Sequence, residues 1–524
     1  MQDTERRLPV GIQSFKEIRC GSYLYVDKTD LIWQLANKGD KYNYLSRPRR
    51  FGKSLLVDTF ECYFTAKKEL FQGLKIMDLE QDWVQRPVIR LDMSQGGSNS
   101  DKLHNFLSRT FSEYEHIYGL TSNNTDSFAN RLDGIIRGAY RQTGAQVVIL
   151  IDEYDYPLQH SWMTDEHEKC ATIYRDMFTV LKSDDQYEKF VFITGITKFT
   201  QISLFSALNN LTNISFDPEY ASICGITEQE IQDNFQPELQ RMAQKNRWTA
   251  QETHDRLKAY YDGYHFCKDN MVDIYNPFSL IMALNKGEIS NYWVASGATT
   301  LLMKFVKDAE VRLNELGECY IMKNTIESSD VTGGGAELFL YQSGYLTIKD
   351  YQEGLYTLGF PNEEVKQALY EAVLPALTMR QEADIRSLQA NLYGQLIMGQ
   401  VDKAKVTLRS LIADVPYSNK KLASMDMEER YRLIISTIFN ALGLRVEVER
   451  MLAGGRIDMV VWTARYVYVF ELKLQKNGGK EAALKQIQNN GYLEPFRGDK
   501  RRVIGLAIEL DDLGRGLIDW QAIE

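Results

Sequence analysis

The sequence predicts an α/β protein of several domains, with a doubly wound parallel sheet in its N-terminal part and a smaller αβββαβ unit at its C-terminus. Three observations support this. The chain has 524 residues, more than one hydrophobic core usually supports. Apolar runs that end in polar residues alternate with helical patterns over residues 42–198. From residue 426 onward, a helix, three strands, a second helix and a strand follow one another.

The first predicted strand, residues 42–45, leads through a basic loop into a helix that opens with a Gly-Lys-Ser triplet. Backbone N–H groups, a lysine and a hydroxyl at a helix N-terminus are what a phosphate and its Mg²⁺ require. Arg47 stands where the pattern G-x-x-x-x-G-K-[ST] has its first glycine, so an ordinary helix start is the alternative. The predicted nucleotide-binding residues here are Arg49, Arg50, Gly52, Lys53 and Ser54.

A second predicted strand, residues 147–151, is an uninterrupted apolar run, as a central parallel strand buried on both faces requires. Asp152 and Glu153 follow it, at the edge where such sheets place their chemistry. The pattern predicts a Walker B-type strand. Asp152 would hold Mg²⁺ together with Ser54, and Glu153 would orient or deprotonate the attacking water. A solvated acidic turn is the alternative.

A third predicted strand, residues 190–194, ends in a polar segment beside Asp152. A polar side chain at that place can sense the γ-phosphate, and Thr194 or Thr197 is the candidate. A capped strand end explains the same residues. The remaining elements predicted in this part are a core strand at 87–92 and helices within 102–144 and over 168–181.

Beyond residue 225 the pattern becomes helical, which predicts a lid-like subdomain. Two short strands around residues 350–354 are typical of the wing of a winged helix. Acidic residues dominate this wing, which favours pairing between domains over binding to DNA. The predicted domains are a P-loop domain (1–225), a helical lid (226–290), a winged-helix-like region (291–362), a helical connector (363–425) and the C-terminal unit (426–524).

The C-terminal unit is predicted to carry a metal site. Glu471 and Lys473 lie two residues apart on the third strand, hence on one face, among apolar neighbours. Buried charges need a reason. Asp458 and Glu471 are symmetric about the turn predicted at 463–465, so they should face each other across two strands. Two carboxylates so close repel each other unless a cation lies between them, which predicts Mg²⁺ there.

Lys473 completes the predicted site, where it would position or deprotonate a water for in-line attack on a phosphodiester. Glu429 at the start of the first helix, and Gln486 and Tyr492 from the second helix and its end, are supporting positions. Simpler explanations are an ion pair between Lys473 and one of the carboxylates, a capping-box role for Glu429, and ordinary packing of the other two.

Composition limits the classes of function. The net charge of −10 argues against a protein that coats nucleic acid by bulk electrostatics, although residues 426–524 hold 15 basic and 15 acidic residues and are neutral. The six cysteines are scattered without a CxxC motif, which predicts reduced thiols in a cytoplasmic protein. No apolar run approaches the ~18 residues of a membrane span, so no membrane contact is expected.

The ordered motifs resemble the bacterial family that joins an AAA-ATPase-like domain to a C-terminal PD-(D/E)XK nuclease-superfamily domain. The matching segments cover essentially the whole chain and are LPVGIQSFKEI, YVDKTDLI, SRPRRFGKSLL, ILIDEYDYPL, FITGITKF, SLFSALNNL, YDGYHF, YNPFSL, GRIDMVV, YVFELKL and ALKQIQNNGY. The loop with Arg47 is similar to the family's own variant. Ile457 replaces the proline of the PD motif without removing a ligand.

This resemblance implies a P-loop fold joined to a restriction-endonuclease-like fold, with ATP and Mg²⁺ as cofactors and DNA or RNA as the partner. The residues it assigns are Lys53, Ser54, Asp152 and Glu153 at the nucleotide site, and Asp458, Glu471 and Lys473, supported by Glu429 and Gln486, at the nuclease-type site. One expected function is an ATP-regulated, Mg²⁺-dependent nuclease in defence or mobile-element biology. The other is a nucleotide-switched binding or scaffold protein with a silent nuclease-like domain. A homo-oligomer is one possible assembly for either.

Overall fold

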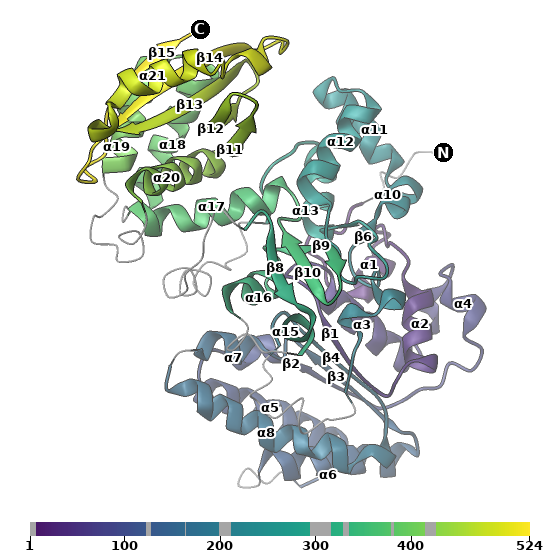
Figure 1. The fold of residues 1–524 in the computed structure, drawn as a ribbon. Coiled ribbons are helices and arrows are strands. Elements are labelled where there is room, and N and C mark those ends of the chain that lie inside the picture. The colour runs from purple at the N-terminus through teal and green to yellow at the C-terminus, as the bar shows by residue number, and fades with distance from the viewer. Residues whose placement is uncertain are drawn as a thin grey trace. The chain divides into compact units, whose positions relative to one another are not determined.

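The computed structural model describes residues 7–121, 127–162, 164–198, 211–293, 316–328, 335–378, 382–413 and 426–524 (Figure 1). The family segment SLFSALNNL lies almost entirely outside the described residues. The described chain forms two compact units. One contains the residues up to 293 together with 316–362, and the other contains those from 363 to the end. Each unit has its own five-stranded sheet.

The sheet of the first unit has the strand order β2-β3-β4-β1-β5, and all its pairings are parallel. β4 lies between β1, which leads into the Gly-Lys-Ser helix, and β3, which ends in the two carboxylates. The register sets Leu45 of β1 beside Thr194 of β4, so the polar ends of three strands meet at one edge. The strands are β1 (Tyr42–Ser46), β2 (Val88–Asp92), β3 (Val147–Asp152), β4 (Glu188–Gly195) and β5 (Thr212–Asn213).

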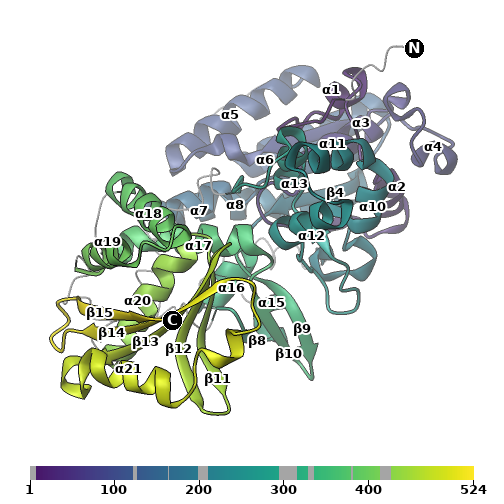
Figure 2. The same ribbon diagram turned by 90° about the horizontal axis from the view of Figure 1, so that it is seen from above.

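Helices cover both faces of this sheet, which confirms the predicted doubly wound architecture. Figures 1 and 2 show α3 on one side and α5, α6 and α8 grouped on the other. Every residue of β3 is buried, as its apolar run requires. The helices are α1 (Phe15–Cys20), α2 (Thr29–Lys38), α3 (Lys53–Phe64), α4 (Ile76–Leu79), α5 (Ser100–Ile117), α6 (Phe128–Thr143), α7 (Tyr156–Ser161) and α8 (Glu166–Ser183).

The segment after residue 225 is helical, as predicted. Its first helix begins with a capping box in which Thr227 and Glu230 exchange side chain to backbone hydrogen bonds. The helices share an apolar core, around Phe235 and Leu257, with Leu8 from the N-terminal segment. The elements are α10 (Glu228–Asn234), α11 (Gln236–Asn246), α12 (Ala250–Tyr261) and α13 (Pro277–Lys286), with β6 (Ile226–Thr227) paired to β7 (Ile274–Tyr275).

The hairpin predicted around residues 350–354 is present and has a third strand that the sequence did not reveal. β9 (Thr347–Gln352) and β10 (Leu355–Gly359) pair antiparallel, and β8 (Cys319–Met322) adds to the other side of β10. Two helices, α15 (Lys323–Ser328) and α16 (Gly335–Gln342), precede the hairpin. The hairpin packs on the YDGYHF segment, because the amide of His265 donates to Oγ1 of Thr347 at 2.8 Å.

The second unit holds a mixed sheet of order β11-β12-β13-β14-β15, in which β13 and β14 are parallel and the other neighbours antiparallel. The predicted αβββαβ order is confirmed, and β15 is an additional strand. The elements are α20 (Met427–Ala441), β11 (Arg445–Leu452), β12 (Gly455–Trp462), β13 (Tyr466–Leu474), α21 (Gly479–Asn489), β14 (Arg502–Leu510) and β15 (Leu517–Ile523).

The helices α20 and α21 cover opposite faces of this sheet. Phe470 of β13 contacts Phe439 of α20, with ring centroids 5.2 Å apart, whereas Val469 shares a core with Ile487 of α21. Successive strand residues point to opposite faces, so the two helices do as well. The helices predicted as a connector pack in this same unit, with α17 against α20. They are α17 (Glu363–Thr378), α18 (Glu382–Ile397) and α19 (Val401–Ala413).

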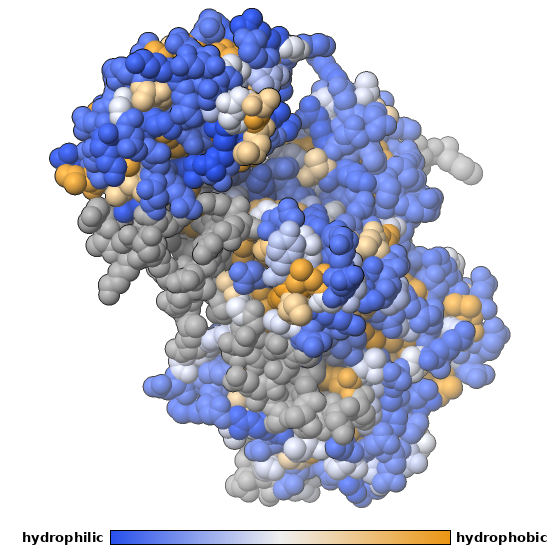
Figure 3. Space-filling view, in the orientation of Figure 1, coloured by the Kyte–Doolittle hydropathy of each residue, from blue (hydrophilic) through white to orange (hydrophobic). Residues whose placement is uncertain are grey.

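The described surface is mainly hydrophilic on the face in Figure 3, where apolar side chains form only small groups. Among the described helices, none is both long and apolar enough to cross a membrane. All six cysteines are free thiols, in agreement with the prediction.

Candidate functional site

The loop from β1 to α3 presents a helix N-terminus and a lysine together. Gly52 precedes the helix with φ +89°, a conformation that favours glycine, and is exposed. The first amides of α3 have no carbonyl partner within the helix, so they can bind an anion. The amino group of Lys53 is buried and donates to the carbonyl oxygens of Arg47 (3.0 Å) and Pro48 (3.1 Å). A bound phosphate would compete for this ammonium.

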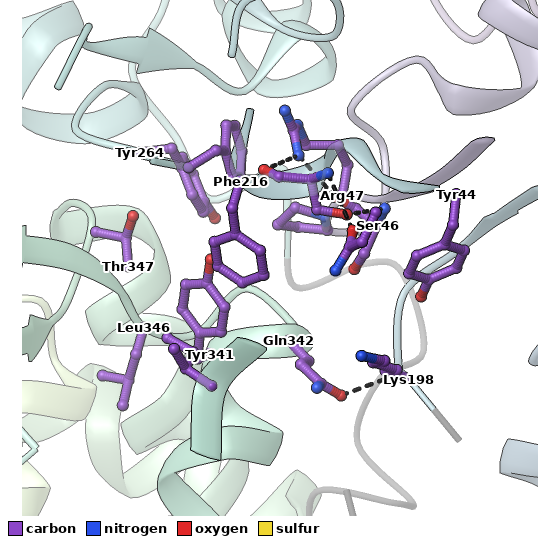
Figure 4. A pocket seen from close by; sticks show the side chains of 15 residues that line it. Tyr44, Ser46, Arg47, Lys198, Phe216, Tyr264, Tyr341, Gln342, Leu346 and Thr347 are labelled. Atoms are coloured by element: carbon purple, nitrogen blue, oxygen red, sulfur yellow. Dashed lines mark hydrogen bonds between the residues drawn. The ribbon is translucent and has the colours of Figure 1, made fainter. Parts of the chain in front are cut away.

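Arg47, which replaces the first glycine of the usual motif, is a core residue. Its guanidinium donates to the carbonyl oxygens of Ser46 and Ser215 and lies 4.0 Å from the ring centroid of Phe266. Figure 4 shows this side chain among those that line a cavity of about 30 Å³, which is large enough for water only. Arg47 therefore fixes the loop between β1 and α3 to the core.

The other predicted residues of the loop take different directions. The Arg49 guanidinium lies 3.5 Å from Oε1 of Gln159 in α7. The Arg50 guanidinium stacks over the ring of Phe278 in α13, 3.9 Å from its centroid. Ser54 lies partly exposed in the first turn of α3. Arg49 thus points toward the side of β3 and Arg50 toward the helical lid.

The ends of β3 and β4 bring Asp152, Glu153 and Thr194 together. The Thr194 hydroxyl donates to Oδ1 of Asp152 at 2.6 Å, and the amide of Glu153 lies 3.4 Å from the same hydroxyl oxygen. Glu153 has φ +48°, which non-glycine residues seldom adopt. Burial raises the pKa of Glu153, and the charge of Lys53 opposes that shift, so the lysine acts on this carboxylate across the site.

Asp155, which was not among the predicted site residues, is hydrogen-bonded to Thr197, the other candidate for the sensor. Its Oδ2 accepts from the amide (2.6 Å) and the hydroxyl (2.6 Å) of Thr197 and from the amide of Ile196 (3.0 Å). Thr197 is therefore occupied in fixing the end of β4. Of the two threonines proposed as sensor, Thr194 is the one beside Asp152. The acidic run DEYD after β3 was the signal for Asp155.

An apolar cavity of about 100 Å³ adjoins Gly52 and the start of α3. This volume is below the ~300–1,000 Å³ of a typical small-molecule site, so the cavity suits one flat ring rather than a whole nucleotide. Its walls come from the N-terminal segment, α3 and the helical lid, and include Pro9, Tyr25, Val26, Leu55, Ile226 and Ile281.

In the second unit, the carboxylates of Asp458 and Glu471 meet where two strands separate. The β12–β13 ladder pairs Met459 with Phe470 and ends there, so Asp458 and Glu471 occupy the next register position, as the symmetry about the turn predicts. Both side chains are buried. Oδ2 of Asp458 accepts from the amide of Leu472 at 2.8 Å, across the gap.

The buried Glu471 and the partly buried Lys473 form an ion pair, with Nζ of the lysine 2.8 Å from Oε1 of the glutamate. Oε2 of Glu471 is buried without a hydrogen-bond partner. Burial, reinforced by Asp458, raises the pKa of Glu471 to about 7. Burial alone would lower the pKa of Lys473, but the hydrogen bond and charge of Glu471 outweigh it and raise that pKa.

Glu428 and Arg432 of α20 contact these strands, and the sequence patterns did not indicate either residue. Glu428 accepts from the amide of Leu474 at 3.1 Å, whereas Glu429 was the predicted supporting residue. Nη1 of Arg432 lies 3.0 Å from Oδ1 of Asp458. The i,i+4 spacing of Glu428 and Arg432, which places both on one helix face, was the available signal.

Gln486 and Tyr492 contact each other rather than the carboxylates. Nε2 of Gln486 donates to the Tyr492 hydroxyl at 3.1 Å, and that hydroxyl donates to the carbonyl oxygen of Arg456 at 2.9 Å. Tyr492 is fully buried in the core under α21. These contacts connect β12 to the C-terminal end of α21. They agree with the alternative that Tyr492 is an ordinary packing residue.

Two segments of the chain, one containing each site, match models of known protein families. The family model described as a predicted AAA-ATPase matches residues 9–205, and that of the PD-(D/E)XK nuclease superfamily matches residues 426–520. A protein of Azotobacter chroococcum mcd 1, described as an uncharacterized protein in the vnfD 5' region, is 32% identical over 534 residues, which cover 99% of each chain.

Proposed function

Since the chain belongs to the family of predicted AAA-ATPases that carry a C-terminal PD-(D/E)XK nuclease-superfamily domain, we propose that it binds ATP at its P-loop and cleaves DNA or RNA with Mg²⁺ at its second site. The observation that carries the nuclease function is the pair of buried carboxylates, Asp458 and Glu471, with the partly buried Lys473 beside them at the opening between β12 and β13. A reaction that uses charged groups accounts for such a cluster in a strand that is otherwise apolar.

The residues of this cluster fit a divalent cation. Oε2 of Glu471 is a buried carboxylate oxygen without a partner, and Asp458 lies beside it. Among the described residues, no three His, Cys, Asp or Glu side chains are grouped as metal ligands, so the protein would supply two carboxylates and water the rest. Mg²⁺ commonly binds in that way.

When bound, the cation supplies Lewis-acid activation of water and neutralises phosphate charge. Asp458 and Glu471 would hold it. Lys473 would orient the water and the phosphate, because its Nζ lies at the site, 2.8 Å from Oε1 of Glu471. In hydrolysis the water oxygen bonds to phosphorus, and one ester oxygen leaves with a proton.

The nucleotide site supports the other half of the proposal. Lys53 and the N-terminus of α3 would bind the phosphates, Ser54 and Asp152 the Mg²⁺, and Thr194 the γ-phosphate end of the site. Glu153 would orient the attacking water. The apolar cavity beside Gly52 would take the base.

The test is to incubate the wild type, Glu471→Gln and Lys53→Ala with single-stranded DNA, duplex DNA and RNA, with Mg²⁺ and with or without ATP. We expect Glu471→Gln to lose cleavage by at least ~100-fold, because it removes a metal ligand. Lys53→Ala should lose ATP binding, measured by isothermal titration calorimetry, and with it any ATP effect on cleavage.

Two matched variants control for charge loss alone. Glu447→Gln removes a carboxylate from β11 outside the site, where it pairs with Arg450. Lys102→Ala removes an exposed lysine from the first turn of α5. Both should behave as the wild type. If the wild type binds ATP but cleaves none of the three substrates, the nuclease proposal is wrong and the scaffold function takes its place.

A further inference from the structure

Arg432 spans two carboxylates at the edge of the nuclease-type site. Its Nη1 lies 3.0 Å from Oδ1 of Asp458, and its Nη2 lies 3.0 Å from Oε1 of Glu449. The Arg432 and Asp458 side chains are each only 12% exposed, so water screens this contact weakly, whereas the Glu449 side chain is 42% exposed. Arg432 reaches both carboxylates from α20, on the opposite face of the sheet from α21.

Glu449 is held in an unusual backbone conformation next to Asp458. The β11–β12 ladder pairs Val448 with Met459 and Arg450 with Ile457, and it skips Glu449 between them. Glu449 has φ +55°, in the left-handed region. The register thus places Glu449, Asp458 and Glu471 in one row across three neighbouring strands, and Arg432, Arg456 and Lys473 are the cations that pair with them.

The two carboxylate oxygens of Asp458 have different hydrogen-bond partners. Oδ2 accepts from the amide of Leu472, while Oδ1 is bound by the Arg432 guanidinium. A cation that uses Oδ1 must displace that guanidinium, because two positive charges at one oxygen repel each other. Glu449 is a second anchor that would keep the displaced side chain at the site.

We propose that Arg432 is a substrate-binding residue of the nuclease site: it neutralises Asp458 before the metal arrives, yields Asp458 to the metal, and then binds the phosphate while Glu449 retains it. This inference rests on the proposed nuclease function. A guanidinium is suited to both states, because its fork matches carboxylate and phosphate alike. An ion pair that only stabilised the fold would stay on Asp458 throughout.

The test measures Mn²⁺ affinity by electron paramagnetic resonance of the free ion, and kcat and KM on the substrate that the wild type cleaves. Arg432→Gln should bind Mn²⁺ several-fold more tightly than the wild type, since the competing guanidinium is gone. Its kcat/KM should fall by roughly 100-fold or more, as expected when one positioned donor to a reacting phosphate is removed. Tighter metal binding with weaker cleavage is a combination that a purely structural role does not produce.

Arg456→Gln is the matched control. Its guanidinium also pairs with Glu449, at 2.9 Å, so the variant makes the same change of charge nearby while leaving both Asp458 oxygens as they are. We expect a smaller change in Mn²⁺ affinity and near wild-type cleavage. If Arg456→Gln tightens Mn²⁺ binding as much as Arg432→Gln does, long-range charge explains the effect and the inference is wrong.

Arg432→Lys serves if the glutamine variant does not fold. A lysine keeps the charge beside Asp458 but loses the fork, so Mn²⁺ affinity should stay near the wild-type value while KM rises. Unchanged KM and kcat would overturn the inference. The proposed function fails separately: in that case the wild type itself shows no Mn²⁺ binding that Glu471→Gln abolishes, and no cleavage.

Discussion

Arg47 replaces the first glycine of the usual motif, and its side chain helps to fix the conformation of the loop. Its guanidinium is tied to carbonyl oxygens of Ser46, Ser215 and Tyr220 below the loop. These hydrogen bonds fix the loop on its buried side. The exposed Gly52 and the first turn of α3 remain accessible to a ligand. The missing glycine is therefore no argument against a phosphate site.

Asp262, in the YDGYHF segment, is a second buried charge outside the two sites. Burial raises its pKa to about 7, although the Lys258 amino group lies 3.8 Å away. The folded state therefore binds a proton that the unfolded state, with a pKa near its ordinary 3.8, has released. The contribution of Asp262 to stability therefore falls as the pH rises from about 4 to 7.

Asp262→Asn should remove this loss, because asparagine resembles the protonated acid. The melting temperature of the variant minus that of the wild type should grow from pH 5 to pH 7 and then level off. The corresponding gain in unfolding free energy has an upper limit of roughly 4 kcal/mol. Scanning fluorimetry at several pH values checks this, with the exposed Asp269→Asn as control. A difference independent of pH would contradict it.

At the scale of elements, the turn between α16 and β9 packs directly on the loop between β1 and α3. Gly344 in this turn has φ +87°, and a Cβ added there would lie 2.5 Å from Cβ of Pro48. The Tyr264 hydroxyl donates to the carbonyl oxygen of Gly344 at 3.0 Å, and the amide of Lys198, after β4, donates to Oε1 of Gln342 at 3.1 Å. Three elements around the nucleotide site thus converge on one turn.

Gly344→Ala should therefore weaken ATP binding as well as stability. The positive φ costs about 1 kcal/mol for alanine, and the collision with Pro48 must move the loop. Gly354→Ala is a close control, because Gly354 has φ +92° but no atom near its added Cβ. Calorimetry with ATP should show weaker binding only for Gly344→Ala. Equal affinities for the two variants would show that the contact with Pro48 does not shape the loop.

At the scale of the whole molecule, each compact unit carries one of the two sites. A ligand that binds only the folded form stabilises the unit that contains its site. In differential scanning calorimetry of the full chain, we expect two transitions, of which ATP raises one and Mn²⁺ the other. Lys53→Ala should abolish the first shift and Glu471→Gln the second.

The outcome also measures coupling between the sites. A single transition that both ligands raise together would contradict independent units. If ATP raises both transitions of the wild type and neither transition of Lys53→Ala, the coupling free energy between the sites follows from the second shift.

Much of the fold followed from patterns within short segments. The buried run of β3, the Gly-Lys-Ser helix start and the helices after residue 225 depend on residues close together in the chain, and the structure agrees with each. The register of β12 and β13 was also predictable, because a tight turn fixes which residues of a hairpin face each other, and so it placed Asp458 opposite Glu471.

The sequence by itself thus determined the two sheets, their order of elements and the acidic residues at their edges, since hydrophobic period and hairpin symmetry are local properties. Tertiary structure alone decided that Arg47 lies in the core, that Thr194 rather than Thr197 meets Asp152, and that Arg432 reaches Asp458. It also added β5, β8 and β15. These features depend on contacts between segments distant in the chain, where three-dimensional packing, and no sequence period, selects the partner.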